Sequence, residues 1–199
     1  MPSRRTTARD LVAVAALALL TEGPTHPYDM LRTIRERRWD FLSGLPRGLY
    51  HAVDRLTGAG WAEPVETVRD GQRPERTVLR ITEEGERELR DWVRDLLADA
   101  RSADAFAAAL TCCYVLEAPD RLAGLEFRAA RLAGRVAELD AQLSRVRDRL
   151  PRAVLLDDEY RRALCHAELV WVESLVADLT SGALNWDFLA EEEGERPTT

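Results

Sequence analysis

Residues 45–61, LPRGLYHAVDRLTGAGW, carry three side chains whose types suit contact with nucleic acid. Arg47 can donate to guanine O6 and N7 in the major groove or to a phosphate oxygen. Tyr50 and His51 can donate to phosphate oxygens. If the segment is a helix, its amino-terminal N–H groups add a partial positive charge beside these side chains. We therefore treat Arg47, Tyr50 and His51 as candidate DNA-binding residues.

The apolar residues of the same segment predict the helix that presents these side chains. Leu49, Val53 and Leu56 recur at the spacing of one helical face, and Pro46 suits the start of a helix. The polar side chains would then point away from the core. Asp54 shares their side, where its carboxylate would repel phosphate unless it accepts a hydrogen bond from cytosine or pairs with an arginine. The sequence leaves both alternatives open.

Two alternating segments follow and supply further arginines. Residues 62–69 and 76–81 alternate in the way that strands do, and the connection between them is rich in turn-forming residues. This pattern predicts a β-hairpin. Arg69, Arg73 and Arg76 lie at its tip, where they could contact the DNA backbone or enter the minor groove.

Helices are predicted on both sides of these elements. Residues 7–21 are almost continuously apolar after Asp10 and end before a Gly-Pro pair, which predicts a buried helix, and a second helix is expected near Pro27. Thr82 is a candidate N-cap for a long helix that runs toward Ala100. Three helices followed by a hairpin are the plan of a winged helix-turn-helix domain, whose third helix enters the major groove.

The second half of the chain is predicted to be helical and to contain a coiled-coil-like seam. Apolar residues alternate at spacings of three and four from Leu122 to Leu150. Pro151 ends this segment, and a last helix is expected from Tyr160 to about Thr180. The seam needs a partner, which is the last helix, the seam of a second chain, or both. The candidate dimerisation residues are Leu122, Leu125, Leu132, Val136, Leu139 and Leu143.

These patterns give the expected fold class and domain limits. The fold is mainly α with a small β-hairpin, made of a winged helix-turn-helix domain and an α-helical, coiled-coil-like carboxy-terminal dimerisation domain. We expect the DNA-binding domain with its linker helix at residues 1–100 and the helical dimerisation domain at 101–190. Residues 191–199 are expected to be a disordered tail.

The charge differs between the two parts of the chain. Residues 1–81 contain 13 arginines and 10 acidic residues, a net charge of +3, whereas residues 82–199 contain 15 arginines and 25 acidic residues, a net charge of −10. An anionic partner is therefore expected to dock on the first part. Acidic residues that solvate long helices would explain the second part equally well.

The sequence contains no signature of catalysis, of a metal site or of a cofactor. It has no Gly-rich phosphate loop, no nucleophile elbow and no His/Cys spacing of a zinc site, and its three cysteines make no disulfide framework. The longest apolar run, Leu11 to Leu20, is ten residues, about half of what a membrane-spanning helix needs. We expect a cytoplasmic protein that is not an enzyme, uses no cofactor and has no membrane partner.

Several linked stretches resemble the PadR-like family of transcriptional regulators. LALLTEGPTHPYDM at residues 17–30 is similar to the family's first helix and its turn into the second. LYHAVDRL at 49–56 is similar to the core of its recognition helix. GQRP at 71–74 and LRITEEG at 79–85 are similar to its wing and to the start of the next helix. The helical carboxy-terminal half is similar to that of the larger family members, which dimerise through it.

The resemblance implies a homodimeric repressor that binds a two-fold-symmetric operator in double-stranded DNA. In several family members a small, often aromatic, effector releases the protein from DNA, so such an effector is a further expected partner. The alternative is a winged-helix module for protein assembly that does not bind DNA sequence-specifically. Salt dependence separates the two, because neutralising phosphates makes DNA affinity fall steeply as salt rises.

Overall fold

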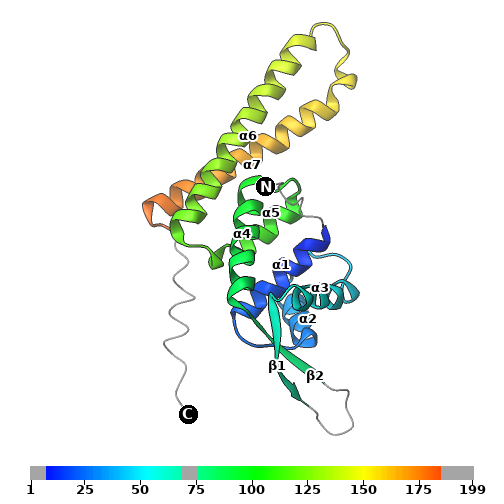
Figure 1. The fold of residues 1–199 in the computed structure, drawn as a ribbon. Helices are drawn as coiled ribbons and strands as arrows, with labels where there is room; N and C mark the ends of the chain where they lie inside the picture. The colour runs from blue at the N-terminus through cyan, green and yellow to red at the C-terminus, as the bar shows by residue number, and fades with distance from the viewer. Residues whose placement is uncertain (1–7, 69–75, 185–199) are drawn as a thin grey trace. The chain divides into compact units, whose positions relative to one another are not determined.

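The computed structural model describes residues 8–68 and 76–184. Its helices and strands follow the predicted order (Figure 1). The elements are α1 (Ala8–Thr21), α2 (Pro27–Glu36), α3 (Arg47–Gly58), β1 (Ala62–Val68), β2 (Arg76–Ile81), α4 (Glu83–Asp99), α5 (Ala103–Cys112), η1 (Cys113–Val115), α6 (Ala118–Val146), η2 (Arg152–Val154) and α7 (Leu156–Ser181). The prediction of a mainly α fold with a small β-hairpin is confirmed.

Two compact units make up the chain, residues Met1–Glu117 and Ala118–Thr199. The sequence analysis placed the boundary after residue 100. In the structure α5 lies in the first unit, because it packs against α4 and α1. The expected tail at 191–199 lies outside the described residues. None of the helices in the described ranges is long and apolar enough to cross a membrane.

Helix α1 is the centre of the first unit. Its ten consecutive residues from Leu11 to Leu20 are all buried, which explains why this stretch is apolar without helical periodicity. The helix is in contact with α3, α4, α5 and β2. It ends at Thr21, two residues before Gly23, whose φ of 143° is a conformation that L side chains rarely adopt. The predicted buried first helix is thereby confirmed.

Strands β1 and β2 form an antiparallel sheet that projects from the three helices (Figure 1). Glu63 lies opposite Arg80, and Arg80 Nε donates to Glu63 Oε1 at 2.7 Å. Thr25, in the connection before α2, pairs with Leu79 through two backbone hydrogen bonds of 2.9 and 3.0 Å. This pairing fixes the base of the hairpin to the helix-turn-helix.

The start of α4 is packed tightly against the end of the α3–β1 connection. Thr82 is the N-cap, as predicted, and its Oγ1 accepts from the Gly85 N–H at 3.1 Å. The Thr82 N–H donates to the Trp61 carbonyl at 3.1 Å, and a Cβ on Gly85 would overlap that carbonyl. The Trp61 and Trp92 rings meet edge to face with centroids 5.2 Å apart. Trp61 therefore belongs to the packing between α4 and the hairpin.

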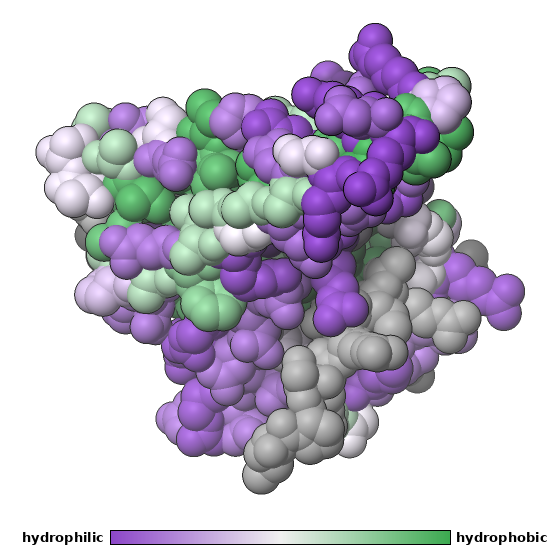
Figure 2. All heavy atoms as spheres, turned by 90° about the horizontal axis from the view of Figure 1, so that it is seen from above, coloured by the Kyte–Doolittle hydropathy of each residue, from purple (hydrophilic) through white to green (hydrophobic). Residues whose placement is uncertain are grey.

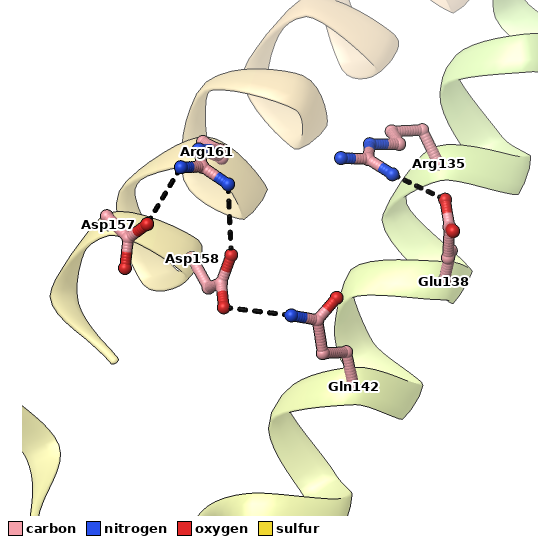
Figure 3. Close-up of polar contacts among 6 residues, drawn as sticks. All are labelled: Arg135, Glu138, Gln142, Asp157, Asp158 and Arg161. Carbon is pink, nitrogen blue, oxygen red and sulfur yellow. Dashed lines mark hydrogen bonds and ion pairs between the residues drawn. The ribbon is translucent and has the colours of Figure 1, made fainter. Parts of the chain in front are cut away.

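Helices α6 and α7 lie side by side and form the second unit (Figure 1). Arg128 is almost fully buried between them and donates through Nε to Glu168 Oε1 at 2.7 Å. A polar contact also joins the two helices, where Gln142 Nε2 of α6 donates to Asp158 of α7 at 3.0 Å; within α7, Asp158 pairs with Arg161 at 3.3 Å (Figure 3). The two helices thus bury apolar side chains against each other and pair several of each other's polar side chains.

Both helices differ at one end from the prediction. Helix α6 ends at Val146, and Leu150 beyond it is 43% exposed, because the chain turns there toward α7. Helix α7 begins at Leu156 rather than at Tyr160, so the acidic residues 157–159 lie inside its first turn, where the helix dipole favours them. Gly182 ends α7 with a left-handed φ of 74°, as expected of a C-terminal glycine.

Candidate nucleic-acid interface

The buried side of α3 fixes which of its side chains face solvent. Leu49, Ala52, Val53 and Leu56 are buried, and α3 packs mainly against α1. Helix α2, which precedes it across a turn, buries Met30, Leu31 and Ile34 in the same unit. The predicted apolar stripe of α3 is confirmed, and the opposite side of the helix is free of the core.

Four polar side chains occupy that opposite side. Arg47, Tyr50, His51 and Asp54 are all exposed, and Tyr50 is 44% exposed despite its aromatic ring. Arg47, His51 and Asp54 follow one another at helical spacings of four and three, so they share one line along α3. Within residues 8–68 and 76–184, none of the four makes a hydrogen bond or ion pair.

Several other arginines among the described residues are paired with carboxylates. Arg37 makes two hydrogen bonds with Glu22, of 2.5 and 2.6 Å, and Arg162 makes two with Asp140, of 2.9 and 3.1 Å. Arg80 pairs with Glu63 across the hairpin. Arg47 has no carboxylate to neutralise it in the part of the chain that the structure describes, so its charge is available to an external anion.

A hollow of about 760 Å³ opens along this side of α3. It is bordered by charged and polar groups from α3, by the turn before α3 and by one residue of α1. The lining residues are Val12, Ser43, Gly44, Arg47, Gly48, His51, Asp54 and Arg55. Sequence periodicity did not indicate Val12, Ser43 and Gly44, because their position depends on how α1 and the turn pack against α3.

A cluster of interacting side chains lies at the end of α1, where the chain turns toward α2. Glu22 receives the two hydrogen bonds from Arg37, and this pairing raises the pKa of the Arg37 guanidinium. The Tyr114 hydroxyl donates to the Ala18 carbonyl at 3.0 Å, and burial raises the pKa of Tyr114. Burial also raises the pKa of the Cys112 thiol to about 12. These groups connect the end of α1 with η1 and with the end of α2.

Of the three arginines predicted at the hairpin tip, the structure describes only the backbone of Arg76. Arg69 and Arg73 lie outside the described residues, and Arg76 begins β2 with a side chain that is not described. Their contact with DNA stays a prediction. Arg80, further along β2, forms an ion pair with Glu63.

The predicted dimerisation seam lies against α7 of the same chain. Leu125, Val136, Leu139 and Leu143 are buried, while Leu122 and Leu132 are partly buried. Pairing within the chain was one of the alternatives that the sequence left open. A contact of this seam with a second chain stays a prediction.

A second apolar surface was missed by the sequence analysis. Apolar side chains reach the molecular surface, and the face drawn in Figure 2 shows them in patches between hydrophilic ones. In α7, Leu156, Tyr160, Leu164 and Trp171 are each at least half exposed and follow one side of the helix. We call these four residues the α7 stripe. The signal was in the sequence, because α7 carries apolar residues at helical spacing on two opposite sides.

The three helices, the hairpin and the exposed side of α3 define a winged helix-turn-helix protein. The model of the family described as "Transcriptional regulator PadR-like family" matches residues 16–91, which run from the end of α1 through α2, α3 and the hairpin into α4. Over these residues the chain matches the PadR-like family of transcriptional regulators. The resemblance found in the sequence is thereby confirmed.

Comparison with solved structures gives matches of low identity. Bacillus subtilis PadR in complex with operator DNA is 19% identical, with a TM-score of 0.39 over 84% of this chain and 98% of that chain. The same protein in complex with p-coumaric acid is 16% identical, with a TM-score of 0.37 over 85% and 99%. The PadR-like regulator BC1756 from Bacillus cereus is 15% identical, with a TM-score of 0.38 over 86% and 99%. Among curated proteins no sequence matches.

Proposed function

We propose that this transcriptional regulator is a homodimeric repressor that binds a two-fold-symmetric operator in double-stranded DNA. The observation that carries the proposal is the exposed side of α3, where Arg47, Tyr50 and His51 have no partner among the described residues. In a winged helix-turn-helix protein this is the helix that enters the major groove. Arg47, in the first turn, contacts guanine or phosphate, and Tyr50 and His51 contact the backbone.

The second chain of the proposed dimer docks on the α7 stripe. A helix that is apolar on two opposite sides buries only one of them against its neighbour, and α6 covers the side of Leu169 and Val172. The four exposed residues of the stripe extend over about 22 Å of helix, from Leu156 to Trp171. In an isologous dimer across this surface, the α7 stripe of one chain packs against the α7 stripe of the other. This arrangement gives the two-fold symmetry that a palindromic operator requires.

Release from DNA by a small effector, aromatic in several family members, is the remaining part of the proposal. It rests on the match to the family model over residues 16–91. Repression is proposed on the same ground.

DNA binding is tested with a random-sequence duplex pool, from which bound molecules are selected at low salt. We expect selection of a symmetric sequence and an affinity that falls steeply between about 50 mM and 200 mM salt. Arg47→Ala should weaken binding to the selected duplex by about 1–3 kcal/mol. Arg101→Ala removes the same charge from an exposed position outside α3 and serves as the matched control.

The outcome of that selection also decides between the two functions that the sequence allowed. If the wild-type protein retains no duplex from the pool at low salt, DNA binding is refuted and a winged-helix assembly module is favoured. If Arg47→Ala and Arg101→Ala weaken binding equally, the contact is general charge attraction and α3 does not read the groove.

The dimer is tested by sedimentation equilibrium. Leu164→Arg places a charge in the middle of the α7 stripe and should convert the dimer to monomers, because a buried unpaired charge is costly. Leu164→Met keeps the apolar surface and should leave the dimer intact. A monomeric wild-type protein, or a dimer that survives Leu164→Arg, would refute this interface.

A further inference from the structure

We propose that Asp54 determines the sequence specificity of α3 by accepting a hydrogen bond from the N4 amino group of cytosine in the major groove. This inference rests on the proposed function, because it assumes that α3 enters the groove. It assigns a role to the one side chain on the exposed side of α3 whose charge is opposite to that of a DNA-binding surface.

The position of Asp54 points its carboxylate at the same target as Arg47 and His51. The three residues follow one another along one side of α3, opposite the buried stripe. All three line the same hollow, together with Val12 of α1 and residues of the turn before α3. A duplex that contacts Arg47 and His51 therefore meets Asp54 as well.

Among the described residues, no polar partner accounts for the Asp54 carboxylate. The sequence left two alternatives, pairing with an arginine or contact with cytosine. In the ranges that the structure describes, Asp54 forms no ion pair and no hydrogen bond, although carboxylates elsewhere in the chain, such as Glu22 and Asp140, pair with arginines. Asp54 also lies beyond the first turn of α3, so the helix dipole does not account for it.

The donor and acceptor groups in the major groove determine which base Asp54 can contact. Phosphates repel a carboxylate, as do O6 and N7 of guanine and O4 of thymine, so only the amino groups of cytosine and adenine can donate to it. Adenine places its N7 acceptor beside its amino group, and that nitrogen repels the second carboxylate oxygen. Cytosine offers the amino group without an adjacent acceptor on the same base, and it is the base that Asp reads in protein–DNA complexes.

The spacing along α3 predicts where this cytosine lies. Arg47 and Asp54 are seven residues apart, which is about 10 Å along a helix axis. That distance corresponds to about three base pairs of duplex. Each operator half-site should therefore contain a guanine contacted by Arg47 and a cytosine, on either strand, about three base pairs away.

The test compares base preferences of wild type, Asp54→Ala and Asp54→Asn, each selected on a random-sequence duplex pool and sequenced. Wild type should prefer cytosine at one position of each half-site. Asp54→Ala should reduce that preference at least about fivefold at that position only, and should bind unselected DNA more tightly because a repulsive charge is gone. Asp54→Asn should shift the preference to adenine, whose N6 and N7 match an amide.

Asp95→Ala, which removes an exposed carboxylate from α4, is the control and should keep the wild-type preferences. If Asp54→Ala selects the same bases as wild type, or weakens all sequences equally, Asp54 does not read a base and the inference is refuted while DNA binding stands. If the wild-type protein selects no sequence, the proposed function itself fails. Asp54 is exposed and has no described partner, so its variants should fold, which circular dichroism confirms before selection.

Discussion

Gly85→Ala should destabilise the first unit, although alanine is normally the better helix residue. Gly85 lies in the first turn of α4, where an added Cβ would overlap the backbone carbonyl of Trp61. That carbonyl cannot move freely, because it accepts from the Thr82 N–H at 3.1 Å and the Trp61 N–H donates to Leu56 at 2.9 Å. Relief of the overlap must separate α4 from the hairpin base or break the Thr82 cap.

The expected cost follows from these contacts. Overpacking costs about 1–3 kcal/mol, and loss of the Thr82 cap costs about 1 kcal/mol. The higher helix propensity of alanine offsets about 1 kcal/mol of this loss. The free energy of unfolding should therefore fall by about 2 kcal/mol, measured by urea denaturation with circular dichroism and tryptophan fluorescence.

Gly58→Ala is the matched control, because Gly58 is the last residue of α3 in the same unit and a Cβ there meets no atom within 4 Å. It should leave stability unchanged or raise it slightly. A Gly85→Ala protein as stable as wild type would refute the close approach of α4 to Trp61.

Three further predictions concern the buried side chains. Leu139→Ala should lower the free energy of unfolding by about 2–5 kcal/mol in urea, since Leu139 is buried between α6 and α7. Glu168→Gln should cost about 1–3 kcal/mol, because it removes the charge of the carboxylate that pairs with the buried Arg128. Glu138→Gln, in an exposed pair, should cost less than about 0.5 kcal/mol. Both costs are measured by urea denaturation. Burial holds the pKa of Cys112 at about 12, so above the ordinary thiol value the unfolded chain loses a proton that the folded chain keeps. Stability should therefore fall as pH rises, by about 2 kcal/mol more between pH 8 and pH 10 in wild type than in Cys112→Ala, measured by urea unfolding at both pH values.

Local patterns were enough to predict the elements that carry the candidate site. The stripe of Leu49, Val53 and Leu56 and the N-cap Thr82 depend on residues a few positions apart, and both are found as expected. The absence of a described partner for Arg47 could not be predicted, because it depends on where carboxylates lie after folding. Arg37 shows the contrast, since its partner Glu22 is brought close only by the turn between α1 and α2.

Long-range packing accounts for what the sequence analysis missed. The need for glycine at Gly85 arises from Trp61, which approaches from the other side of the hairpin. The heptad spacing of α6 required a partner but could not identify it, because α7 and a second chain offer similar apolar surfaces. Apolar periodicity on one side of a helix does not indicate the α7 stripe, because α7 is apolar on two sides and Leu164 and Leu169 lie opposite each other.

The burial of α1 has a consequence for synthesis of the chain. Residues Leu11 to Leu20 leave the ribosome before α5, which packs against α1 and ends at Cys112. At about 5–20 residues per second, roughly 5–20 s pass before α5 has been made. During that time the most apolar segment of the protein is exposed to other nascent chains, so chaperone supply should limit the yield of soluble protein more strongly than the final stability of the fold.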